Sequence, residues 1–294
     1  MEAVLNNILM ASDFSKHAHY ALQRATTLAR QNKASLHFVH ILNNSWMANF
    51  TQFPINEMQQ ALFAEKKKAE QQLFNLLKEY THDSSSHVSV LTGRVIDEIV
   101  RYAEENHCEL IVAGAHGQYY INDYLLGTTS ESIVRQSHIP ALLIKKEPMA
   151  DYKRILITTD FSEVSKGAVE FAFNCFPQAT LQVLHVLDIH HRQFFDKNED
   201  VLSSKPPITK DIIERLDDFL KTCHVGQKKF QKKIIGGYFA DAIVEQSEQW
   251  QADLIVFGTQ GNSKLHYMIM GSVATRILHK SGVDMLVVPP KKNN

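Results

Sequence analysis

The sequence predicts an α/β fold of two tandem doubly wound, Rossmann-like domains, each with a five-stranded parallel sheet in the order 3-2-1-4-5. Three observations support this prediction: the chain repeats itself, each repeat alternates short apolar segments with amphipathic ones, and the apolar segments are continuous. Continuous apolar strands are typical of a parallel sheet that helices cover on both faces. The length of 294 residues also suits two domains better than one.

An internal repeat is clearest around a glycine-containing segment of each half. Residues 109–117 read ELIVAGAHG and residues 253–261 read DLIVFGTQG, at an offset of 144. The same offset relates Asp97 to Asp241. Self-similarity at a fixed period indicates repeated structural units, so the two halves are expected to share one fold.

The boundary between the two copies lies in a polar segment. Residues 12–15 read SDFS and residues 159–162 read TDFS, so each copy begins with the same short motif. Between the copies, residues 145–153 are polar and contain a proline, which is typical of a linker. We therefore predict domains at 1–148 and 149–294.

The first half begins with a short apolar run, residues 4–11, which predicts a strand. Apolar residues then recur at helical spacing over 15–31, where Ser15 is placed to cap the helix. Residues 55–80 predict a long helix with one charged side. A strand is predicted over 35–42, before this long helix. After it the predicted elements are strand 88–91, helix 95–106, strand 110–113, helix 128–137 and strand 141–144.

The second half repeats this alternation. Its predicted strands are 155–158, 181–187, 232–235, 254–257 and 285–288, and its predicted helices are 162–176, 209–222, 240–249 and 272–279. Ligands of such sheets bind beyond the carboxyl ends of the strands, where the strand order reverses. The last strands, 141–144 and 285–288, are short and apolar, and bare sheet edges tend to pair. We expect them to pair into an intramolecular pseudo-dimer, and a homodimer remains open.

Composition excludes several classes of function. The formal net charge is -1 and 21% of the residues are charged, so no strong field favours nucleic acid or an anionic membrane. No apolar run approaches the roughly 20 residues of a membrane span. Three cysteines without paired spacing are typical of reduced thiols, and the N-terminus does not resemble a signal peptide. We expect a cytoplasmic protein with no nucleic-acid or membrane partner.

A glycine motif in each half points to phosphate binding. Gly114 and Gly117 follow the fourth strand, and Gly127 and Thr128 open the next helix after an interval of nine residues. The second half has the same pattern at Gly258, Gly261, Gly271 and Ser272. Glycines allow positive φ and close approach of backbone N–H groups to an anion, and a helix N-terminus adds its dipole. The alternative is that the glycines only shape turns and the hydroxyls only cap helices.

The motif G-x-x-G, nine residues and G-[S/T], together with D-F-S after the first strand, resembles the ATP-binding class of the universal stress protein family. The resemblance covers both halves. It implies a five-stranded sheet of the adenine nucleotide alpha hydrolase type that binds ATP, often in dimers or tandem pairs, with the motif glycines on the phosphates and ribose. Any magnesium would accompany the phosphates, because the sequence shows no carboxylate cage.

The resemblance also assigns residues outside the glycine motif. The aspartate near the adenosine corresponds to Asp13 and Asp160, and the apolar adenine contact after a histidine corresponds to Ile41 and Val186. His116 matches a cationic position before the second glycine. Gln260 departs from that position in the second half, and Ala11 and Thr158 replace a common proline.

Other interpretations of single residues stay open. Asp13 and Asp160 could cap the first helix of each half. The cluster of His185, His190 and His191 could suggest a metal, but it lacks regular ligand spacing.

In the second loop Lys264 could supply the positive charge that Gln260 does not, whereas Asp123 of the first loop would repel phosphate. We therefore expect tighter ATP binding in the second half.

Function follows from the motif. We expect an ATP-binding stress or regulatory protein whose adenine nucleotide controls an unknown protein partner. The sequence has no G-K-[S/T] lysine and no kinase catalytic loop, so binding without efficient catalysis is favoured. The alternatives are a slow ATPase or phosphotransferase, and a scaffold with vestigial nucleotide sites.

Overall fold

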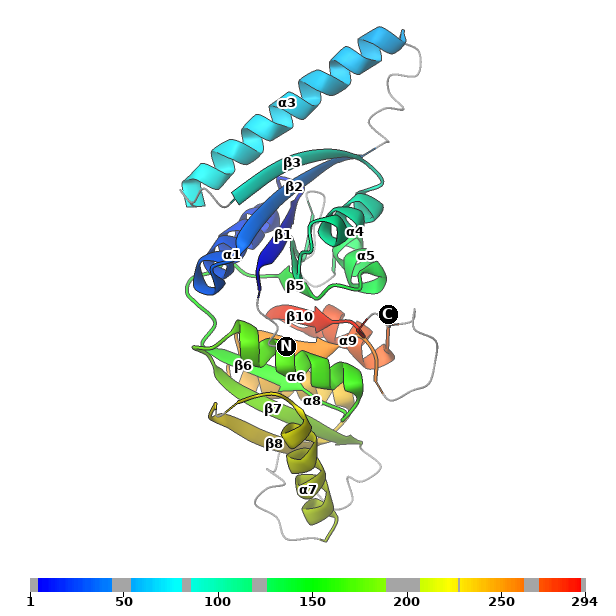
Figure 1. The fold of residues 1–294 in the computed structure, drawn as a ribbon. Helices are drawn as coiled ribbons and strands as arrows, with labels where there is room; N and C mark the ends of the chain where they lie inside the picture. Colours follow the sequence, from blue (N-terminus) through cyan, green and yellow to red (C-terminus); the bar gives the residue numbers. More distant parts are fainter. Residues whose placement is uncertain are drawn as a thin grey trace. The chain divides into compact units, whose positions relative to one another are not determined.

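The chain forms two compact units (Figure 1). The first is Leu5–Met149, and the main segment of the second begins at Ala150. The computed structural model describes residues 5–43, 54–80, 86–117, 126–188, 207–226, 228–261 and 270–291.

The first unit alternates strands and helices along the chain. Its elements are β1 (Asn7–Ser12), α1 (Lys16–Asn32), β2 (Ser35–Asn43), α3 (Ile55–Tyr80), β3 (Ser86–Gly93), α4 (Val95–Glu105), β4 (Leu110–Gly114), α5 (Thr128–Gln136) and β5 (Ala141–Ile144). The strands lie in the order β3-β2-β1-β4-β5, and every neighbouring pair is parallel. The predicted order 3-2-1-4-5 is confirmed.

The second unit has the same architecture. Its elements are β6 (Arg154–Thr158), α6 (Glu163–Cys175), β7 (Thr180–Asp188), α7 (Pro207–Thr222), β8 (Phe230–Gly237), α8 (Phe239–Gln249), β9 (Leu254–Gly258), α9 (Ser272–Lys280) and β10 (Asp284–Val288). Its strands lie in the order β10-β9-β6-β7-β8 and are also parallel. In terms of chain order this is again 3-2-1-4-5, read from the other end.

Helices cover both faces of the sheet in the first unit. Helices α1 and α3 contact each other and lie on one face, and α4 and α5 do so on the other (Figure 1). The central strands are consequently sealed: Ile8, Leu9 and Met10 of β1 are 0% exposed. Burial on both faces explains why these strands are continuous apolar runs and not alternating ones.

The third strand of each unit is longer than the sequence predicted. β3 extends over Ser86–Gly93 and β8 over Phe230–Gly237, whereas only 88–91 and 232–235 were expected. Both lie at an edge of their unit's sheet, and their side chains are mostly partly or fully exposed. Polar residues are therefore tolerated at their ends, and the apolar run marks only the middle of the strand.

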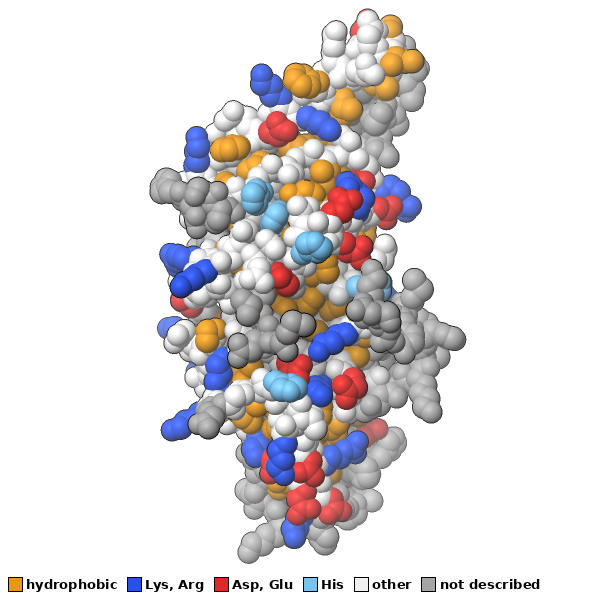
Figure 2. Space-filling model, in the orientation of Figure 1, with side chains coloured by type: hydrophobic (Ala, Val, Ile, Leu, Met, Phe, Trp, Pro, Cys, Tyr) orange, Lys and Arg blue, Asp and Glu red, His pale blue; other side chains and the backbone are white. Residues whose placement is uncertain are grey.

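The charged surface mixes both signs (Figure 2). Arg101 forms ion pairs with Glu98 and Glu105, and Arg135 pairs with Glu131, so acidic neighbours on the same helix neutralise these two arginines. Among the described helices, none is both long enough and apolar enough to cross a membrane.

The three cysteines are buried and unbridged in the described chain. Burial raises the pKa of Cys108 to about 12 and that of Cys223 to about 11. Thiols with raised pKa are poor nucleophiles because little thiolate forms at neutral pH. Packing, and not thiol chemistry, accounts for these residues.

A stability prediction arises in α6. Gly167 lies within this helix, and a Cβ added there would meet no atom within 4 Å. Because glycine within a helix costs about 0.5–1 kcal/mol relative to alanine, Gly167→Ala is expected to raise the free energy of unfolding by about that amount. Urea denaturation measures it, and a lower midpoint for the variant would contradict the described environment.

Candidate functional site

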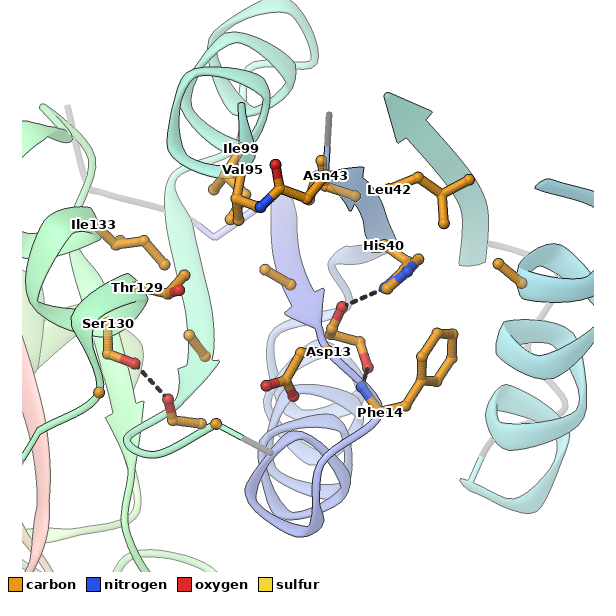
Figure 3. A pocket seen from close by; sticks show the side chains of 18 of the residues that line it. Asp13, Phe14, His40, Leu42, Asn43, Val95, Ile99, Thr129, Ser130 and Ile133 are labelled. Atoms are coloured by element: carbon orange, nitrogen blue, oxygen red, sulfur yellow. Dashed lines mark hydrogen bonds between the residues drawn. The ribbon is translucent and has the colours of Figure 1, made fainter. Parts of the chain in front are cut away.

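A cavity of about 700 Å³ opens in the first unit at the carboxyl ends of β1 and β4, between which the strand order reverses (Figure 3). Seven residues predicted from the sequence line it: Asp13, Ile41, Gly114, His116, Gly117, Gly127 and Thr128. The structure thus brings together residues more than one hundred positions apart, at the place where doubly wound sheets bind ligands.

A tight turn after β1 presents Asp13 to this cavity. Asp13 Oδ1 accepts a hydrogen bond from the Ser15 N–H at 3.0 Å, and Ser12 Oγ accepts one from the Phe14 N–H at 3.1 Å. These bonds hold Phe14 at a φ of 61°, a left-handed conformation that costs a non-glycine residue about 1–3 kcal/mol. Strained residues of this kind gather at functional sites.

The expected alternative of aspartate as helix cap is wrong in both units. The N-cap of α1 is Ser15, whose side chain accepts from the Ala18 N–H, and the N-cap of α6 is Ser162, which accepts from the Ser165 N–H. Asp13 and Asp160 precede the caps by two residues. Their carboxylates are positioned by the turn, which leaves them beside the glycine loop.

His40, the histidine that precedes Ile41 in β2, also lines the cavity, although it is not among the site residues predicted from the sequence. Its Nδ1 donates to the Ser12 carbonyl oxygen at 2.8 Å, because a carbonyl can only accept (Figure 3). Burial lowers the pKa of His40, so the ring is neutral at pH 7. Because Nδ1 carries the proton, Nε2 is an acceptor. Phe14 packs on the ring at a centroid distance of 4.5 Å.

The glycines are required by close approach and not by positive φ. A Cβ on Gly114 would lie 2.7 Å from the His17 backbone, and one on Gly127 would lie 3.2 Å from the Ala115 carbonyl oxygen. At Gly117 it would lie 3.0 Å from Asp13 Oδ2. No motif glycine in either unit has a φ in the left-handed region, so that part of the expectation is wrong.

The N-terminus of α5 faces the same cavity. Its N-cap is Gly127, which offers no side-chain cap, and Thr128 is the first helical residue, so the expected alternative of a capping hydroxyl is wrong. The Ser130 hydroxyl donates to the Gly114 carbonyl oxygen at 2.6 Å and ties the helix to the end of β4 (Figure 3). First-turn N–H groups have no intrahelical acceptor and attract anions.

The second unit has a smaller cavity at the equivalent place, about 200 Å³. Asp160, Val186, Gly258, Gly261 and Gly271 line it, and Gly271 is again an N-cap without a side-chain bond. Ser272 begins α9 and is exposed, but it is not among the lining residues. Lys264 and His190 and His191 lie outside the described residues, as does Asp123 of the first loop.

Comparison with known proteins decides the family. The profile of the Universal stress protein family matches the chain twice, over residues 5–145 and 151–289. The chain belongs to the universal stress protein family. Membership of the family, which the two glycine motifs predict, is therefore confirmed, as is the tandem arrangement.

Individual universal stress proteins show the same relationship. One from Methanocaldococcus jannaschii is 31% identical over 144 residues, which cover 48% of this chain and 85% of that protein. A putative universal stress protein from Staphylococcus aureus strain USA300 is 28% identical over 170 residues, covering 53% and 95% respectively. A crystal structure of a universal stress protein from Archaeoglobus fulgidus, 17% identical, aligns with a TM-score of 0.71 over 98% of this chain and 99% of that chain. The last likeness shows the fold alone.

The histidine beside the D-F-S turn recurs in both universal stress protein repeats. In the second, His185 Nδ1 donates to the Thr159 carbonyl oxygen at 2.8 Å, and Phe161, at a φ of 65°, packs on the ring at 4.2 Å. Burial lowers the pKa of His185 as well. The signal that could have identified this role is the recurrence of a histidine in the second strand of both halves.

These histidines predict a pH dependence of stability. Their folded pKa values lie below the ordinary 6.5, so between the folded and unfolded values the unfolded chain binds more protons. The stability that the two neutral histidines contribute is fully present above about pH 6.5, and it is lost as the pH falls through their folded pKa values. Urea denaturation at pH 5.5 and 7.5 measures the difference, which His40→Gln should reduce. An equal difference in wild type and variant would assign the dependence to other groups.

Proposed function

We propose that the chain binds ATP in the first unit and acts as a nucleotide-dependent regulator in the stress response, without efficient catalysis of its own. The observation that carries the proposal is the cavity between β1 and β4, which combines the glycine loop, the uncapped N-terminus of α5 and the Asp13 carboxylate. Its volume lies within the range of about 300–1,000 Å³ that ligand sites occupy.

The charges of the cavity suggest an orientation for the nucleotide. Phosphates suit the α5 N-terminus, because its first-turn N–H groups donate and its dipole is positive. Asp13 can only accept hydrogen bonds when ionised, so it suits a ribose hydroxyl and disfavours phosphate. Ile41 is buried at the end of β2 and lines the cavity together with Ile99, which offers apolar contact to a base.

The same cavity is poorly equipped for phosphoryl transfer. Among its described lining residues the one lysine or arginine is Lys68, which is well exposed and lies 3.9 Å from Glu65. Phosphoryl transfer depends on cations that are held rigidly on the transferred group and on an aligned nucleophile. We therefore infer that ATP occupancy, and not its hydrolysis, is the signal that a protein partner reads.

The test is to identify the nucleotide that purified full-length protein carries. We expect mass spectrometry of the released small molecules to show adenine nucleotide, and calorimetry with ATP to show saturable binding. Phosphate release should stay near the rate without protein. Absence of both released and added nucleotide would contradict the proposal, and rapid turnover would contradict its non-catalytic part.

A further inference from the structure

The two repeats differ most in the room they leave at equivalent places. The cavity of the first unit measures about 700 Å³ and that of the second about 200 Å³. The first lies within the usual range for ligand sites and the second lies below its lower end of about 300 Å³. The two units share one fold, and several side chains at equivalent positions of the two cavities differ.

Two phenylalanines narrow the second cavity. At the offset of 144, Val95 of the first unit corresponds to Phe239, and Ala113 corresponds to Phe257. All four side chains line their respective cavities. Phe257 is 2% exposed, so its ring occupies buried space beyond the reach of the Ala113 methyl group, while Phe239 lines the cavity and is 40% exposed. Each exchange puts a phenyl ring where the first unit has a small side chain.

In the second unit the turn residue Phe161 packs against α7 and is not among the described residues that line the cavity. Phe161 contacts Phe219 of α7 at a centroid distance of 5.6 Å, and the Arg215 guanidinium lies 4.7 Å from its ring. In the first unit the corresponding Phe14 lines the cavity together with polar residues of α3, namely Glu65, Lys68 and Gln72. There the space between the turn and the helix belongs to the cavity.

The N-terminus of α9 in the second unit carries fewer polar side chains than that of α5 in the first. Thr129 and Ser130 line the first cavity, and their counterparts in the second are Val273 and Ala274. Ser130 donates to the end of β4, a bond that an alanine cannot make. The second site therefore keeps its glycines but offers fewer hydrogen bonds and less volume.

We propose that Phe239 and Phe257 are specificity-determining side chains that keep a complete nucleoside triphosphate out of the second site, so that the chain binds one ATP. This inference rests on the proposed function of the first site. It differs from the sequence prediction that both sites take ATP with the second the tighter, because that prediction compared loop charges such as Lys264 and Asp123 and not the volumes of the sites. Volume precedes charge, since a ligand that does not fit cannot reach a cation.

Calorimetry of full-length protein with magnesium and ATP tests the inference. We expect one ATP per chain for wild type. Phe239→Val should add a second binding event, and the double variant with Phe257→Ala should strengthen it. The single variant removes a partly exposed ring, so it preserves folding even where the buried Phe257→Ala costs stability. Tyr238→Ala, which removes the neighbouring exposed ring outside the cavity, is the matched control and should keep one ATP per chain.

The reciprocal change tests the same idea in the first site. Val95→Phe should weaken ATP binding at least about tenfold. Two ATP molecules bound by wild type, or one ATP bound equally by wild type, Phe239→Val, the double variant and Val95→Phe, would overturn the inference and leave the proposed function standing. No ATP bound by folded wild type would overturn the proposed function itself.

Discussion

Replacing Gly117 by valine is expected to abolish ATP binding by the full-length protein, with at least about a 100-fold loss of affinity, or about 2.7 kcal/mol. The Cβ of the new residue would lie 3.0 Å from Asp13 Oδ2, closer than most real contacts of this kind. The carboxylate would have to move, and the γ-methyl groups would occupy the cavity that Gly117 lines. Calorimetry with ATP measures the loss.

A matched control exists in the same chain. Gly282 has no atom within 4 Å of an added Cβ and no positive φ, so Gly282→Val should leave ATP binding unchanged. Near-native binding by Gly117→Val would remove this loop from the site. Because one binding site per chain is expected, complete loss in Gly117→Val also separates the first site from the second.

Replacing Gly114 by alanine is expected to destabilise the fold by about 1–3 kcal/mol, the usual cost of overpacking. Its added Cβ would lie 2.7 Å from the His17 carbonyl carbon and 2.9 Å from the carbonyl oxygen. Both atoms belong to the backbone of α1, so relief requires a shift of the helix and not a change of rotamer. Urea denaturation measures the loss.

Gly167→Ala is the natural comparison, because the same single methyl group should there raise stability. Opposite signs for the two variants would show that the close approach of α1, and not glycine content in general, fixes residue 114. A Gly114→Ala variant as stable as wild type would mean that the helix can move at little cost. The glycine at this position would then need a ligand-based explanation.

The sequence was most informative where burial is symmetrical. Central strands such as β1 and β4 are sealed on both faces and therefore appear as continuous apolar runs. At the sheet edges, β3 and β8 carry polar ends that weaken the pattern, so their lengths were underestimated. Helix positions were well predicted, including the cap at Ser15.

The site was predicted in its residues but not in its reasons. Spacing showed that Gly114, Gly117 and Gly127 belong together, but only coordinates show that each glycine has a different neighbour to avoid. The role of His40 depends on a hydrogen bond to the Ser12 carbonyl oxygen, 28 positions away, which no local sequence pattern predicts. Cavity volume also escaped prediction, because it depends on pairs of side chains from separate elements.

Each cavity is built entirely from its own repeat: the described lining residues of the first lie between Ala11 and Ile133, and those of the second between Thr158 and Ile277. After a gene duplication, such self-contained sites are inherited as two spare copies of one function. A substitution such as valine to phenylalanine in one copy then leaves selection on the other undisturbed. In a tandem chain, one repeat can therefore accumulate substitutions in its cavity while the other repeat keeps the ancestral ligand site.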